Sequence, residues 1–200
     1  MLTYNTLAPA KVYMKGKPAV AGCPPEHEAL TTQITLTTSG ADETRRVGAA
    51  MGRAAQAGDI ILLQGELGAG KTTLTQGILR GLGSDDYASS PTFVLISQYP
   101  ARLTLYHVDL YRISKPEDTF ELGLDEILDG DGLCVVEWAE RALEQFPAEH
   151  LTVKLLRTGD ETRSLVIEAS GSGYTRYMQE ISAVGTPRQA PGQASTSAGS

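Results

Sequence analysis

A glycine-rich stretch that ends in a lysine and a threonine is the part of this sequence best suited to chemistry. Residues 65–72 match the pattern G-x-x-x-x-G-K-[ST]. Glycines let the backbone approach an anion closely, and the N-terminus of a following helix adds partial positive charge. Lys71 can reach the β- and γ-phosphates of a nucleotide, and the Thr72 hydroxyl can ligate Mg²⁺. The residues predicted to bind the nucleotide are Gly65, Glu66, Leu67, Gly68, Ala69, Gly70, Lys71, Thr72 and Thr73.

Two acidic residues at the ends of predicted strands are candidates for the metal and for the hydrolytic water. Glu137 follows the apolar run 133–136, which is typical of a strand buried on both faces. Asp109 ends the more mixed strand 103–109. Since Mg²⁺ is usually shared between the loop hydroxyl and such an acid, Glu137 is assigned to the metal shell, directly or through water. Asp109 is assigned to orient the attacking water or to belong to the outer metal shell. The alternative for both Glu137 and Asp109 is an acid that only caps a turn.

Four further residues have two interpretations each. Thr92, in a Ser-Pro-Thr turn, is either a sensor of the γ-phosphate or an ordinary turn hydroxyl. Trp138 packs either near the nucleotide or in the core. Arg112 either neutralises phosphate charge or forms a surface ion pair. His107 is interpreted as a packing residue of its strand rather than a catalyst.

The periodicity of apolar residues predicts the elements that position these side chains. Ile60–Leu63 is a strand that leads into the loop, and a helix follows from Lys71 to Leu82. An earlier helix, capped by Ser39 or Asp42, is predicted to run to about residue 56. The other predicted strands are 33–37, 94–99, 103–109, 133–136, 151–156 and 165–167, and short helical segments are predicted at 115–122 and 124–128.

Length and composition indicate one soluble globular domain with extensions. The chain has 200 residues, of which 41% are hydrophobic and 20% charged. Residues 1–32 contain four prolines and no periodicity, and residues 181–200 are rich in small and polar residues. We therefore expect a disordered N-terminal extension at 1–32, a folded domain at 33–180 and a disordered tail at 181–200.

Charge and cysteine content exclude several classes of protein. The net charge of −7 argues against a protein that coats nucleic acid through its overall field. Two cysteines do not form a disulfide framework, so a reducing cytoplasm is expected. No apolar run approaches the roughly 18 residues of a membrane helix, so no membrane partner is expected.

Several spaced motifs resemble one family of proteins. They cover residues 33–169 and resemble the TsaE (YjeE) family of bacterial P-loop ATPases. The motifs occur in the order Gly65 to Thr73, Ser90-Pro91-Thr92-Phe93, His107-Val108-Asp109-Leu110-Tyr111-Arg112, Gly123-Leu124-Asp125-Glu126 and Val136-Glu137-Trp138.

The resemblance implies a single α/β domain with a three-layer P-loop NTPase-like fold, in which helices flank a mixed, mostly parallel central sheet. It also implies that ATP is bound and hydrolysed with Mg²⁺, and that ADP is released. The expected partners are the TsaB-like and TsaD-like proteins, whose heterodimer threonylcarbamoylates the tRNA adenosine beside the anticodon. The chain is then an accessory ATPase that meets tRNA only through the complex, and it is not the transferase. Lys71, Thr72, Asp109 and Glu137 match the family's nucleotide and metal positions.

Two other classes are weighed against this reading. A small-molecule kinase usually needs an arginine-rich lid, and the sequence has no arginine between Arg112 and Arg141. A GTPase-like switch usually contains an Asn-Lys-x-Asp stretch that reads guanine, and none occurs here. ATP is therefore favoured over GTP.

Overall fold

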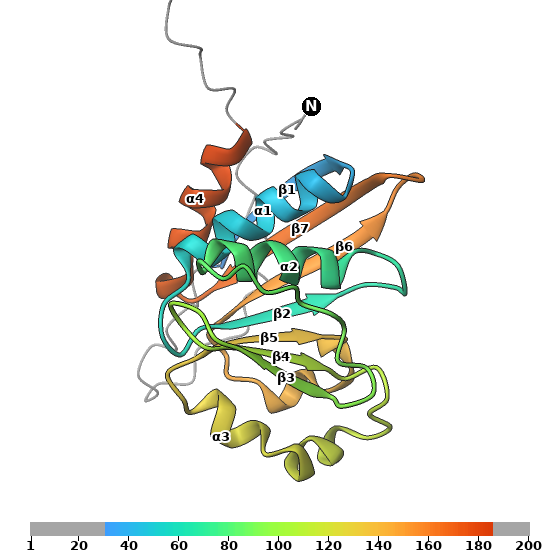
Figure 1. The fold of residues 1–200 in the computed structure, drawn as a ribbon, viewed down its shortest axis with the longest axis vertical. Coiled ribbons are helices and arrows are strands. Elements are labelled where there is room, and N and C mark those ends of the chain that lie inside the picture. The colour runs from blue at the N-terminus through green and yellow to red at the C-terminus, as the bar shows by residue number, and fades with distance from the viewer. Residues whose placement is uncertain (1–30, 186–200) are drawn as a thin grey trace, which may run out of the picture.

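The computed structural model describes residues 31–185, which form a seven-stranded sheet with the order β1-β7-β6-β2-β5-β4-β3 (Figure 1). The central strands β6, β2, β5 and β4 run parallel, whereas β1, β7 and β3 pair antiparallel with their neighbours. The predicted mixed α/β sheet is therefore confirmed. The strands are β1 (Thr31–Ser39), β2 (Ile60–Gln64), β3 (Ile96–Tyr99), β4 (Leu105–Asp109), β5 (Leu133–Glu137), β6 (His150–Arg157) and β7 (Thr162–Ser170).

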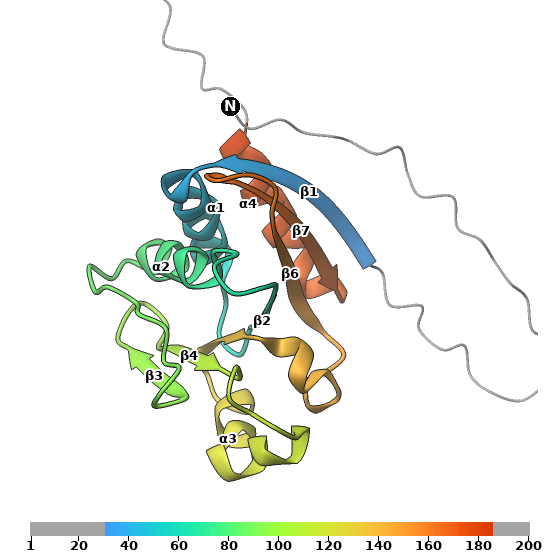
Figure 2. The same cartoon turned by 90° about the vertical axis from the view of Figure 1, so that its right-hand side faces the viewer.

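Helical segments cover both faces of the sheet (Figure 2). Alternate residues of β2 enter two separate apolar clusters, since Ile61 and Leu63 belong to one cluster and Ile60 and Leu62 to the other. The first cluster packs against α1, α2 and α4, and the second packs against α3 and the short turns near it. These segments are α1 (Ala41–Ala54), α2 (Lys71–Gly81), α3 (Leu124–Leu128), α4 (Thr175–Gly185), η1 (Pro116–Leu122), η2 (Ala139–Arg141), η3 (Leu143–Gln145) and η4 (Ser172–Tyr174).

Helices α1 and α2 meet through glycines. A Cβ atom built on Gly48 or Gly52 of α1 would lie 2.3 or 2.2 Å from a backbone oxygen of α2. A Cβ atom on Gly77 or Gly81 of α2 would lie 2.2 Å from a backbone oxygen of α1. These distances are far below van der Waals contact, so the backbones approach as closely as they do because neither helix carries a side chain there. The helix that begins at the phosphate loop is thereby held directly against α1.

The buried carboxylate of Asp59, in the turn before β2, connects that turn to α4. Its Oδ2 accepts hydrogen bonds from the backbone N–H of Gln56 at 2.7 Å and from the Tyr177 hydroxyl at 2.6 Å. The guanidinium of Arg176 forms an ion pair with the same oxygen. Since buried charges need partners, these contacts fix the start of α4 against the strand that leads to the loop.

The helix α4 extends the folded domain beyond the expected boundary at residue 180. Ile181 is fully buried and lies on the same helix face as Tyr177 and Met178. The composition of the tail concealed this spacing of three and four residues, which is typical of a packed helix. The predicted extensions otherwise fall outside the described residues, except that β1 begins at Thr31.

The starts of α1 and β3 also differ from the prediction. Helix α1 begins after Gly40 without a side-chain cap, whereas Ser39 or Asp42 was expected to cap it. Ser39 instead donates its backbone N–H to the Glu43 carboxylate at 2.8 Å. Strand β3 begins at Ile96 rather than Val94, because Leu95 adopts a left-handed φ of 65° that interrupts extended backbone.

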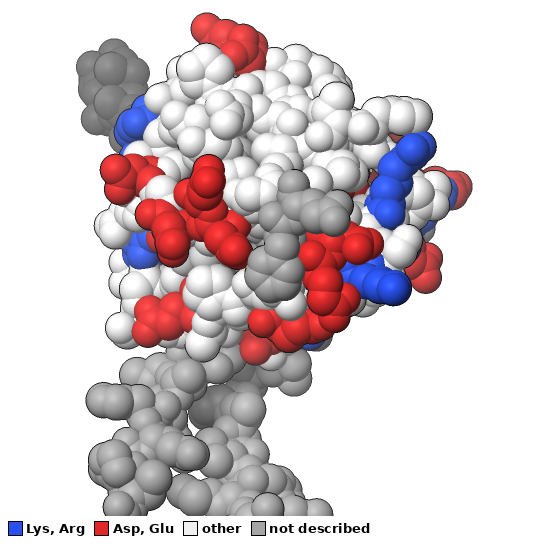
Figure 3. Space-filling model, turned by 90° about the horizontal axis from the view of Figure 1, so that it is seen from below, with Lys and Arg blue, Asp and Glu red and all other residues white. Residues whose placement is uncertain are grey.

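One face of the molecule is acidic. Seen from below, the surface around α3 carries many more acidic than basic side chains (Figure 3). The negative charge of this face repels other anions. Exposed acids within residues 117–149, the part of the chain that contains α3, are Glu117, Asp125, Glu126, Asp129, Asp131, Glu140, Glu144 and Glu149. Between residues 31 and 185, every helix is too short or too polar to span a bilayer.

Candidate nucleotide site

The glycine-rich loop connects the end of β2 to the first turn of α2. Gly65, Gly68 and Gly70 have φ values of 140°, 77° and 107°, a region that side chains disfavour. At Gly65 a Cβ atom would also lie 2.4 Å from the carbonyl oxygen of Leu155. The glycines therefore allow the tight path of the loop, and the loop leads directly into the N-terminus of a helix, where backbone N–H groups attract anions.

Lys71 is buried and lies over the loop that precedes it. Its Nζ donates hydrogen bonds to the carbonyl oxygens of Gly65 at 2.6 Å and Glu66 at 3.0 Å. The same ammonium lies 3.7 Å from the ring centroid of Trp138, a distance at which the aromatic face attracts a cation. Burial lowers the pKa of Lys71, and the negative charge of Glu137 opposes that shift. A partly desolvated cation of this kind interacts strongly with a phosphate group.

Thr72 and Glu137 meet beside the loop. The parallel register of β2 and β5 sets Glu137 next to Leu63, just before the loop begins. The Thr72 hydroxyl donates to Oε1 of Glu137 at 2.8 Å, and Glu137 is only 3% exposed. A hydroxyl and a carboxylate are hard oxygen donors, and Mg²⁺ typically binds one or two protein groups of this kind together with waters and phosphates. The pair therefore fits a magnesium ion.

An all-protein metal cage is not present in the described part of the chain. Within residues 31–185, no three His, Cys, Asp or Glu side chains are grouped so that they could hold an ion.

Asp109 is connected to the turn that contains Thr92. Its Oδ2 accepts hydrogen bonds from the hydroxyls of Ser90 at 2.6 Å and Thr92 at 2.9 Å, and its Oδ1 accepts the Tyr111 N–H at 2.9 Å. In the sheet, Asp109 is the register partner of Glu137. The two predicted acids thus lie side by side, but each is bound to a different part of the site.

The aromatic rings of Tyr111 and Trp138 form one wall of the site. Trp138 has a left-handed φ of 60°, and its ring packs against Tyr111 with centroids 5.0 Å apart. Trp138 therefore lies beside the loop, and it also packs against the second apolar cluster, so both of its interpretations stand. The guanidinium carbon of Arg112 lies 4.3 Å from the centroid of the exposed Phe93 ring, and Arg112 makes no ion pair within residues 31–185.

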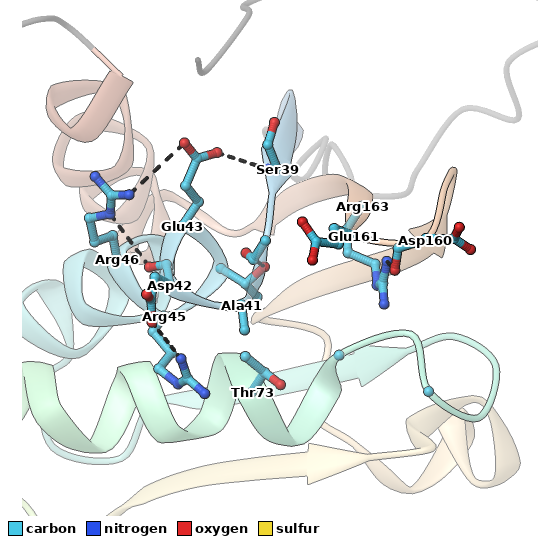
Figure 4. A pocket seen from close by; sticks show the side chains of 14 residues that line it. Ser39, Ala41, Asp42, Glu43, Arg45, Arg46, Thr73, Asp160, Glu161 and Arg163 are labelled. Atoms are coloured by element: carbon cyan, nitrogen blue, oxygen red, sulfur yellow. Dashed lines mark hydrogen bonds and ion pairs between the residues drawn. The ribbon is translucent and has the colours of Figure 1, made fainter.

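Two cavities meet at the loop. A cavity of about 380 Å³ is lined by the predicted residues Lys71, Thr72, Thr92, Asp109, Glu137 and Trp138, together with parts of the loop. A second cavity of about 650 Å³ lies between the β1–α1 turn, the start of α2 and the β6–β7 turn (Figure 4). Gly68, Gly70 and Thr73 line both cavities, so the loop forms their common boundary.

Apart from Gly68, Gly70 and Thr73, the residues of the larger cavity were not predicted from the sequence. Arg45 of α1 bonds to Asp42 at 2.6 Å and to Gln76 at 3.2 Å, and Arg163 of β7 lies across the cavity (Figure 4). The only local signal was charge on the first turn of α1, which occurs on many exposed helices. The roles assigned to the six residues of the smaller cavity stay predictions, although the structure brings all six together.

The fold and site together define an α/β protein with a P-loop NTPase-like fold. The central strands of its sheet are parallel, a glycine-rich loop joins a strand to a helix, and a Lys-Thr pair stands at the start of that helix. The family model described as threonylcarbamoyl adenosine biosynthesis protein TsaE matches residues 38–165. The chain therefore belongs to the TsaE family, and the resemblance found from its motifs is confirmed.

Relatives and a solved structure agree with this assignment. The tRNA threonylcarbamoyladenosine biosynthesis protein TsaE of Bacillus subtilis is 40% identical over 151 residues, which cover 75% of this chain and 94% of that protein. The protein of the same name from Treponema pallidum is 41% identical over 64% of this chain and 94% of its own length. A crystal structure of Bacillus subtilis YdiB matches with a TM-score of 0.66 and 36% identity, over 77% of this chain and 97% of that chain.

Proposed function

We propose that this protein is a Mg²⁺-dependent ATPase that supports a TsaB–TsaD complex in the threonylcarbamoylation of tRNA. The observation that carries the proposal is the 2.8 Å hydrogen bond between Thr72 and Glu137, directly beside the buried Lys71. These are the hydroxyl, carboxylate and ammonium groups that a Mg²⁺-nucleotide requires at the end of a phosphate loop. The names of the relatives support the part of the proposal that concerns tRNA threonylcarbamoyladenosine biosynthesis.

In this proposal each side chain has a defined task. The loop N–H groups bind the phosphates, and Lys71 exchanges its bonds to the Gly65 and Glu66 carbonyls for bonds to phosphate oxygens. Thr72 and Glu137 hold Mg²⁺, which neutralises charge that develops on the phosphates. The larger cavity, which shares residues with the loop, receives the ribose and base.

Asp109 and Thr92 act on the hydrolytic step. Asp109 orients the attacking water once its Oδ2 is released from the hydroxyls of Ser90 and Thr92. Thr92 is then free to contact the γ-phosphate, so the turn that carries it responds to whether ATP or ADP is bound. A partner that stabilises the released turn would accelerate hydrolysis, and we assign that role to the TsaB–TsaD complex.

The test compares Lys71→Ala and Thr72→Ala with the wild-type protein and with Lys154→Ala, which removes an exposed lysine of β6. ATP binding is measured by calorimetry, and by the emission of Trp138, the single tryptophan. Hydrolysis and formation of the modified adenosine are measured with TsaB–TsaD and tRNA present. The two site variants should lose binding or turnover, whereas the control should keep both. Full activity in both site variants would refute the proposal.

A further inference from the structure

His107 is a fully buried histidine on β4 whose ring contacts the acid proposed to hold Mg²⁺. Its exposed fraction is 0%, and its Nε2 lies 2.8 Å from Oε1 of Glu137. In the sheet, His107 is the register partner of Val135 rather than of Glu137. The contact is therefore made by the side chains along the strand direction and does not follow from backbone pairing alone.

The hydrogen bonds of the ring indicate where its proton lies. A carboxylate oxygen only accepts, so the bond to Glu137 places a hydrogen on Nε2. Nδ1 is buried and has no hydrogen-bond partner in the described part of the chain. With the hydrogen on Nε2, Nδ1 is an unfilled acceptor. The opposite tautomer would bury an unpaired N–H donor and set two acceptors 2.8 Å apart, which costs more.

Two donors therefore converge on one oxygen of Glu137. Oε1 accepts from Thr72 and from His107, both at 2.8 Å. Oε2 has no hydrogen-bond partner among residues 31–185, and Glu137 lines the smaller cavity. The last torsion of a glutamate is broad and roughly two-fold, so a carboxylate with one donor can rotate more freely than one with two.

We propose that His107 is a positioning residue that orients the Glu137 carboxylate and leaves Oε2 for Mg²⁺ or for a water bound to it. The inference rests on the proposed function, because it assigns a task within that same metal site. Groups that hydrogen-bond to a metal ligand typically change metal affinity 10- to 100-fold when they are removed. A histidine that only fills the core would be replaceable by an apolar side chain of similar length.

The experiment compares His107→Met, which removes the donor, with His107→Gln, which retains an N–H donor on a side chain of similar length. ATP affinity of the full chain is measured with Mg²⁺ and in excess chelator. His107→Met should weaken the Mg²⁺-dependent part of binding about 10- to 100-fold and leave metal-free binding unchanged, and His107→Gln should restore most of the loss. In a Glu137→Gln background, His107→Met should have no further effect, because the two changes act through one contact.

Equal losses with and without Mg²⁺, or equal losses in both histidine variants, would overturn the inference in favour of plain packing. A wild-type protein that binds no Mg·ATP would overturn the proposed function together with the inference.

The tautomer of His107 gives a second readout, which is measured on the wild-type protein and needs no variant. ¹⁵N NMR of histidine-labelled wild-type protein, which has three histidines, should show a ring protonated at Nε2 with no exchange with solvent. If the buried ring carries its hydrogen on Nδ1, the inference is wrong.

Discussion

Replacement of Gly77 by alanine separates two effects that act in opposite directions. Gly77 lies inside α2, where alanine is favoured over glycine by about 1 kcal/mol when the new methyl group has room. Here a Cβ atom would lie 2.2 Å from the Arg45 carbonyl oxygen, whereas ordinary contact begins near 3.4 Å. The helices would have to separate by roughly 1 Å, and a forced shift of this kind in a packed interface costs about 1–3 kcal/mol or more.

We expect the clash to exceed the gain in helix propensity, because backbone rather than a flexible side chain opposes the methyl group. After the gain of about 1 kcal/mol is subtracted, a net loss of about 1–2 kcal/mol corresponds to a fall in Tm of about 2–8 °C for a domain of this size. The assay is urea denaturation followed by circular dichroism, supported by thermal melting. Gly173→Ala is the matched control, because its Cβ atom would meet nothing closer than 3.7 Å. A Gly77→Ala protein as stable as the wild type would refute the argument that close backbone contact requires glycine here.

Three other predictions concern the acids, α4 and the buried thiol. Glu137→Ala should weaken the Mg²⁺-dependent part of ATP binding about 10- to 100-fold, whereas Asp109→Asn should keep binding and slow single-turnover hydrolysis with partners by about 100-fold. The reverse pattern would mean that the two roles are exchanged. Tyr177→Phe removes a hydrogen bond to the buried Asp59 carboxylate and should cost about 1–3 kcal/mol in urea denaturation, and an unchanged midpoint would contradict this. Burial raises the pKa of Cys134 from 9.0 to about 12, so the unfolded chain loses this proton first as pH rises above 9. The stabilising contribution is full below pH 9 and is lost toward pH 12. Between pH 8 and 10.5 the wild type should therefore lose about 2 kcal/mol more than Cys134→Ala, and parallel pH profiles would contradict this.

Features carried by neighbouring residues could be predicted from the sequence. The loop at residues 65–72, the apolar strand ending at Glu137 and the hairpin of β6 and β7 each have a local pattern of apolar, glycine or alternating residues. The same local patterns also allowed Thr72 and Glu137 to be predicted in one site. An acidic residue that binds the metal is expected at the end of a strand beside the loop.

Features that depend on distant partners could not be predicted. The task of His107 depends on a glutamate 30 positions later, and Asp59 binds an arginine 117 positions later. The glycines of α1 and α2 are ordinary in each helix alone, and only the opposing backbone makes them necessary. Periodicity describes which face of an element is buried, but it does not identify the groups on the facing element.

The pairing of β1 with β7 has a consequence for the order of events during synthesis. Ser39 pairs with Thr162 and Thr31 with Ser170, so the partner of the first strand leaves the ribosome more than 120 residues later. At about 5–20 residues per second, β1 waits roughly 6–28 s. Both glycine-bearing helices and the phosphate loop are synthesised within that interval. The threonines of β1 suit such a delay, because they favour extended backbone yet keep an unpaired strand hydrated. Closure of the sheet is therefore a late step in the biogenesis of this domain.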